Sequence, residues 1–110
     1  MKVILDENLP KPLKDIFPNH TVTTVQEQGL AGTLNGALLV RLEGDFDVFI
    51  TADKNLRYQQ NLSGRSLAIL ELPTNRLPLL RPMFPHIATA VDAIPAGEYV
   101  QLALPRPNGA

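Results

Sequence analysis

The sequence predicts an α/β fold with a mostly parallel central sheet. Short β-branched and aliphatic runs, typical of buried strands, alternate along the chain with helical patterns and turn residues. Strands that are separated by helices favour parallel pairing with right-handed crossovers. The length of 110 residues suits a single domain, which we place at residues 1–103, followed by a loose tail at residues 104–110.

Five segments have the composition of strands, with Val, Ile, Leu, Phe and Thr concentrated in a few residues. They are Lys2–Leu5, His20–Val25, Asp47–Thr51, Leu67–Leu72 and Glu98–Leu102. The fourth segment is almost continuously apolar, as expected for a strand that is covered on both faces.

Helical patterns lie between these strands. The first helix is expected after Asn8, a candidate N-cap, with a proline in its first turn. Its apolar stripe consists of Leu9, Leu13, Ile16 and Phe17. The second is expected from Asn35, again a candidate cap, to Leu42, with Gly44 placed to end it. A third helix carries Ile87, Val91 and Ile94 on one face.

Composition excludes several classes of protein. Cysteine is absent, which excludes disulfides and thiolate metal sites and makes the cytoplasm the expected compartment. The N-terminal apolar run meets acid at Asp6 and Glu7, unlike a secretory signal, and no run reaches the ~18 apolar residues that span a membrane. The net charge of -1 offers no broad basic face, so a polyanion would have to meet local cations or a bound metal.

Polar residues gather where two of the predicted strands end. Asp6, Glu7 and Asn8 follow the first strand, and Asp53 and Asn55 follow the third. Parallel sheets bind ligands at the carboxyl ends of their strands, near the point where strand order reverses. We therefore expect Asp6 and Asp53 at the same edge of the sheet.

Two neighbouring carboxylates favour a divalent cation. At about 4 Å they repel by roughly 1 kcal/mol in water and about 4 kcal/mol near a protein surface, which a cation offsets. Oxygen ligands favour Mg²⁺ or Mn²⁺ over zinc, and such an ion polarises a phosphoryl oxygen and activates water. Asp and Asn after strands also cap helices or shape turns without any chemistry, and the spacing leaves both interpretations open.

Other chemistries lack their residues. No Gly-Lys-Ser/Thr motif is present to form a phosphate loop, and neither Ser63 nor Ser66 stands in a nucleophile elbow. A receiver-type phospho-acceptor domain also has acids after strands one and three, but it needs a Lys after a late strand. Lys54 is the last lysine of this chain.

Three segments together resemble a known family. The opening Val-Ile-Leu-Asp-Glu-Asn-Leu-Pro at residues 3–10 resembles small PIN-like proteins, long described as a domain of unknown function and grouped with toxin–antitoxin nucleases. Thr51-Ala52-Asp53 resembles their Thr-x-Asp signature after a central strand, and Val25–Gly32 with Asn35-Gly36 is similar to their glycine-marked loop and helix start. The resemblance covers about residues 1–60.

The resemblance implies a three-layer PIN-like, Rossmann-like fold and a metal-dependent cut of RNA. Asp6 would be the first ligand of Mg²⁺ or Mn²⁺ and Asp53 the second. The family tends to carry further acids on the middle helix and two residues past the signature aspartate, where this chain has Asn35 and Asn55.

Other residues receive supporting roles in this hypothesis. Glu7 or Glu43 would assist catalysis. The residues expected to position water, ligand or substrate phosphates are Asn8, Asn35, Thr51, Lys54, Asn55 and Arg57. The expected partners are an RNA substrate and a small antitoxin protein; the oligomeric state, a homodimer included, stays open. The alternative, motivated by Asn35 and Asn55, is a catalytically weak or inactive PIN-like module that binds RNA or a protein partner.

Overall fold

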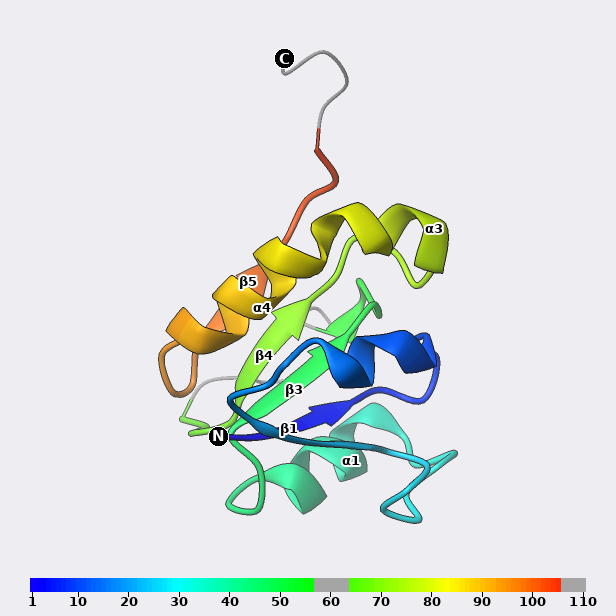
Figure 1. Cartoon of the computed structure of the whole chain (residues 1–110). Helices are drawn as coiled ribbons and strands as arrows, with labels where there is room; N and C mark the ends of the chain where they lie inside the picture. The colour runs from blue at the N-terminus through cyan, green and yellow to red at the C-terminus, as the bar shows by residue number, and fades with distance from the viewer. Residues whose placement is uncertain (57–63, 106–110) are drawn as a thin grey trace.

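Within the described residues, five parallel strands form one sheet at the centre of the molecule. The computed structural model describes residues 1–56 and 64–105 (Figure 1). The strands are β1 (Lys2–Leu5), β2 (Thr21–Thr24), β3 (Val48–Thr51), β4 (Ala68–Glu71) and β5 (Tyr99–Gln101). Their order is β2-β1-β3-β4-β5, and every neighbouring pair is parallel, which confirms the predicted α/β class.

Helices cover both faces of this sheet. They are η1 (Lys11–Asp15), α1 (Asn35–Leu42), α3 (Leu77–Leu80), η2 (Arg81–Met83) and α4 (Phe84–Ala93). Figure 1 shows α1 below the sheet, with η1 and α4 on the other side. Among the described residues, no helix combines the length and the hydropathy that crossing a bilayer requires.

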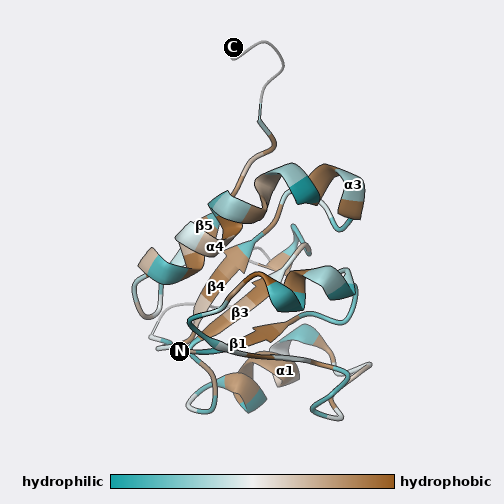
Figure 2. Ribbon diagram, in the orientation of Figure 1, coloured by the Kyte–Doolittle hydropathy of each residue, from teal (hydrophilic) through white to brown (hydrophobic). Residues whose placement is uncertain are grey.

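The alternation of side chains along the strands builds two cores. Leu5 of β1 packs on one face, in a cluster with Leu13 of η1 and Ile87 of α4. Ile4 points to the other face, where it joins Phe49 of β3 and Leu39 of α1. These side chains are at most 1% exposed, and the apolar strands stand out at the centre of Figure 2. Helix, sheet and helix therefore form the three predicted layers.

Two predicted helix caps are wrong. Asn8 lies within a turn and caps no helix, and the 3-10 helix η1 begins only at Lys11, after Pro10. Pro10 and Pro12 stand at its start, where a missing N–H costs little. At α1 the N-cap position is held by Leu34, whose backbone is extended. Asn35 is therefore the first helical residue, and its side chain bonds to Asp53 instead of capping the helix. The predicted end is confirmed, since Gly44 follows α1 with a φ of 87°.

Candidate metal and phosphate site

The site lies where the order of the sheet reverses. From β1 the chain moves to β2 on one side and then to β3 on the other, so the loops after β1 and β3 leave in opposite directions. Such a switch point opens a crevice at the carboxyl ends of the strands. Asp6 follows β1 directly and Asp53 stands two residues after β3, and both line a pocket of about 370 Å³. The pairing predicted for these two residues is thus found in one pocket.

The hydroxyl group of Thr51 connects the two aspartates. The sheet register places Asp6 beside Thr51, because the Asp6 N–H donates to the Ile50 carbonyl at 2.9 Å. Thr51 Oγ1 then donates to Asp6 Oδ2 at 2.7 Å and accepts from the Asp53 N–H at 3.0 Å. Thr51 is fully buried, so neither bond competes with bulk water. This residue fixes the relative positions of both acids.

The start of α1 holds the second aspartate. Asn35 Nδ2 donates to Asp53 Oδ2 at 2.8 Å, and the Asn55 N–H donates to Asp53 Oδ1 at 3.0 Å. Asn35 therefore occupies the place on the middle helix where the resemblance calls for an acid, and it contributes an amide instead of a charge. Asn55 does not line the pocket; it contributes its backbone N–H to the turn.

Burial and neighbouring charges both act on the carboxyl group of Asp6. Its Oδ1 accepts from the Glu7 N–H at 2.8 Å, so both of its oxygens have donors. Burial raises the pKa of Asp6, and the carboxylates of Glu7 and Asp53 raise it further, against the opposing effect of the Thr51 and Glu7 hydrogen bonds. A bound cation would oppose both effects, because it favours the charged form of Asp6.

The chain turns directly after β1, which brings Glu7 and Asn8 to the same pocket. The Leu9 N–H donates to the Asp6 carbonyl at 3.1 Å, closing the turn. Glu7 Oε1 accepts from the Gly32 N–H at 3.3 Å, which links the pocket to the loop before α1. Lys54 lines the pocket as well and brings a positive charge to it.

Glu43 does not belong to this pocket. It ends α1 at the opposite edge of the sheet, where it accepts hydrogen bonds from the Ser66 and Leu67 N–H groups before β4. A strand of four residues, about 13 Å long, separates this edge from Asp6 and Asp53. Arg57, expected to meet substrate phosphates, lies outside the described residues.

Several polar residues were missed by the sequence analysis. Thr33, Thr74 and Asn75 also line the pocket. Thr74 and Asn75 follow β4 at the same edge, so the rule that identified Asp6 and Asp53 could have identified them too. Glu71 is a further case: it pairs in register with Thr51, is 3% exposed, and accepts from Tyr99 Oη and Gln101 Nε2. The sequence already showed Glu71 as an acid inside an otherwise apolar predicted strand.

The donor set fits a weakly held hard cation. Within residues 1–56 and 64–105, no group of three or more His, Cys, Asp or Glu side chains is placed to hold a metal. Mg²⁺ commonly uses only one or two carboxylates and completes its shell with water and substrate phosphate. Asp6 and Asp53 match that smaller requirement, with Glu7 beside them.

Comparison of the chain with protein-family models, with curated proteins and with solved structures finds no match.

Proposed function

We propose that this chain is a Mg²⁺- or Mn²⁺-dependent endoribonuclease of PIN-like type. The observation that carries the proposal is that Asp6 and Asp53 face one pocket at the switch point of the sheet and share the buried hydroxyl of Thr51. Two carboxylates held together by a third residue cost electrostatic energy that a cation offsets.

Each residue of the pocket has a role in the proposal. When bound, the ion would polarise a phosphoryl oxygen and activate water for in-line displacement. Asp6 and Asp53 would hold it, while Thr51 and Asn35 keep their carboxylates in place. Lys54 would pair with a substrate phosphate at the edge of the pocket.

The family resemblance extends the proposal to the cell. It implies that the chain is the toxin of a toxin–antitoxin module, acts in the cytoplasm, and is restrained by a small antitoxin protein. The cysteine-free sequence agrees with a reducing compartment.

A second candidate is a PIN-like module that binds RNA or a protein partner without cutting. Asn35 and Asn55 favour it, because they stand where further acids are expected and because they donate to both oxygens of Asp53. An aspartate that is already satisfied by the protein can serve a structural purpose alone.

Metal-linked stability separates the two candidates. We would measure thermal unfolding in EDTA and in Mn²⁺ for the wild type, Asp6→Asn and Asp53→Asn, with Glu43→Gln as an acid removed at the far edge. If the dissociation constant is about 1 mM, Mn²⁺ at about 10 mM stabilises by about 1.4 kcal/mol, and raises Tm by about 5 °C. We expect this rise in the wild type and Glu43→Gln only.

The same four proteins would then be incubated with single-stranded RNA. The nuclease proposal expects Mn²⁺-dependent cleavage that is lost in both aspartate variants and kept in Glu43→Gln. RNA binding without cleavage, together with no Mn²⁺ effect on Tm, would support the binding module instead.

A further inference from the structure

A second groove adjoins the acidic pocket. It has a volume of about 470 Å³ and lies between η1 and the end of β2. It is lined by Leu5, Asp6, Leu9, Pro10, Lys11, Lys14, Thr24, Gln26 and Glu27. Asp6 and Leu9 line the acidic pocket as well, so the two hollows border each other at these residues after β1.

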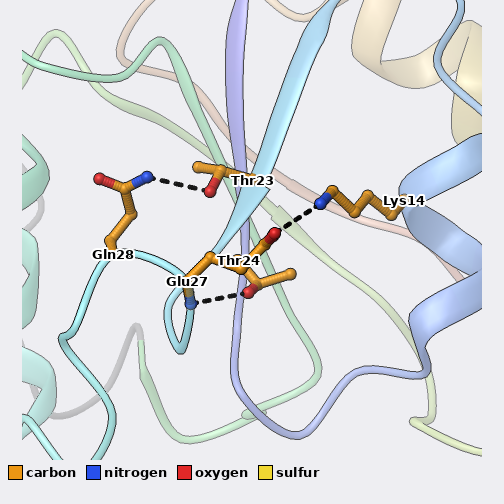
Figure 3. Close-up of polar contacts among 5 residues, drawn as sticks. All are labelled: Lys14, Thr23, Thr24, Glu27 and Gln28. Atoms are coloured by element: carbon orange, nitrogen blue, oxygen red, sulfur yellow. Dashed lines mark hydrogen bonds and ion pairs between the residues drawn. The ribbon is translucent and has the colours of Figure 1, made fainter.

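An ion pair crosses this groove. Lys14 Nζ of η1 contacts Glu27 Oε2, in the turn after β2, at 2.7 Å (Figure 3). The Glu27 N–H donates to Thr24 Oγ1 at 3.1 Å, which orients the turn. The two charged side chains are 39% and 47% exposed, so water and salt weaken their attraction. A stronger anion can therefore take Lys14 away from Glu27.

A second cation stands beside Lys14. Lys11 lies three residues earlier on the 3-10 helix, where side chains at positions i and i+3 point the same way. In the part of the chain that the structure describes, no ion pair engages Lys11. The groove thus has one unengaged lysine and one that is held by an exchangeable partner.

The remaining lining differs from that of the acidic pocket. Pro10 offers an apolar ring beside Leu5 and Leu9, which are only 1% and 8% exposed, and Thr24 and Gln26 offer hydrogen-bonding groups. An unpaired base of single-stranded RNA needs both: a surface for its flat face and polar groups for its edge. In a duplex the faces of a base are stacked and its Watson–Crick edge is paired, so it offers neither.

We propose that this groove binds the nucleotide next to the scissile phosphate of single-stranded RNA, and that an RNA phosphate displaces Glu27 from Lys14. This inference rests on the proposed function, because the groove lies beside the cut only if Asp6 takes part in the cleavage. Glu27 then acts as a competitor for the substrate: it holds Lys14 in the free protein and gives it up when RNA binds.

Two variants of the ion pair test this inference because they should act in opposite directions. Lys14→Gln removes the phosphate contact, and we expect it to weaken binding of a labelled single-stranded RNA of about ten nucleotides by about 3- to 10-fold, and to lower the salt slope by about 1. Glu27→Gln frees Lys14 and should tighten binding about 3-fold. The double variant should bind like Lys14→Gln. Binding would be measured by fluorescence anisotropy with Ca²⁺ in place of Mg²⁺ or Mn²⁺. Ca²⁺ binds oxygen ligands in a looser geometry than Mg²⁺.

The outcomes separate this inference from the proposed function. If the ion pair is only structural, both variants lose the same bridge and change RNA affinity alike or not at all; thermal unfolding of both would show whether they fold. Suppose that cleavage depends on Mn²⁺ and on Asp6, but Lys14→Gln and Glu27→Gln bind RNA with equal affinity. This result would contradict the groove as the nucleotide site and leave the proposed nuclease function standing. The groove would also be rejected as an RNA site if the wild type bound no RNA. The same holds if the two variants had opposite effects on the binding of an acidic peptide but not on the binding of RNA.

Discussion

The charge of Asp6 acts against the fold when no cation is present. Its folded pKa lies above its ordinary value of 3.8, so the folded chain holds this proton more tightly than the unfolded chain. The stability that the protonated carboxyl group of Asp6 adds is complete below pH 3.8. It is lost as the pH rises through the folded pKa of Asp6. In urea unfolding with EDTA, we expect the wild type to lose stability relative to Asp6→Asn as the pH rises above 3.8 and through the folded pKa. A difference that stays constant with pH would contradict this assignment.

Asn35 limits the negative charge of the pocket. Asn35→Asp replaces its amide by a carboxylate of the same size next to Asp53 Oδ2, now 2.8 Å from Asn35 Nδ2. The two carboxylates should repel, by roughly 1–4 kcal/mol depending on exposure, so the metal-free variant should be less stable. A third oxygen ligand should raise Mn²⁺ affinity about tenfold, or about 1.4 kcal/mol, in calorimetric titration.

A matched variant controls for net charge in that experiment. Asn19→Asp adds the same charge on the exposed turn before β2, away from the pocket. It should leave Mn²⁺ affinity unchanged. Equal effects of the two variants would mean that the ion responds to the overall charge of the protein and not to ligands in the pocket.

At the scale of single elements, the turn before β5 depends on Gly97. Its φ is 77°, and a Cβ atom there would lie 2.4 Å from the Arg65 carbonyl oxygen. Gly97→Ala should therefore cost more than the roughly 1–2 kcal/mol of the left-handed conformation alone. Gly44→Ala is the control, because its φ of 87° carries the same conformational cost with open space around the new methyl group. Equal losses of urea stability would show that the turn moves to relieve the contact.

Strands were easier to predict than helices, for a physical reason. A buried strand needs only a short apolar run, and β3 and β4 lie within the predicted Asp47–Thr51 and Leu67–Leu72. The stripe after Asn8 did predict burial, since Leu13 and Phe17 are in the core. Apolar spacing does not distinguish an α-helix from a short 3-10 turn, so the type of helix and its cap were missed.

At the scale of the whole molecule, topology decided which part of the site was predictable. Asp6 and Asp53 meet because parallel strands end at one edge, which sequence order alone suggests. The bond from Asn35 to Asp53 depends on the rotation of α1 against the sheet, which apolar spacing sets only coarsely. The sequence also did not show where Glu43 lies. It ends α1 at the edge of the sheet opposite the pocket, where it bonds to the Ser66 N–H.

The strand order does not by itself identify the chemistry. The order β2-β1-β3-β4-β5 is shared by doubly wound domains of unrelated function, receiver domains among them. A receiver needs a lysine after a late strand, and no lysine follows Lys54 in this sequence. The side chains of the pocket therefore distinguish the candidates where topology does not.

The bond between Thr51 and Asp6 joins residues that are 45 positions apart. A loop of that length must close before either aspartate acquires its neighbour, and such distant pairing is slow to form. A chain in which β3 has not yet docked on β1 contains no pocket, because Asp6 and Asp53 then lie apart. A cation held by Asp6 and Asp53 would then slow unfolding and leave the rate of folding unchanged, so that it would lengthen the lifetime of the finished chain.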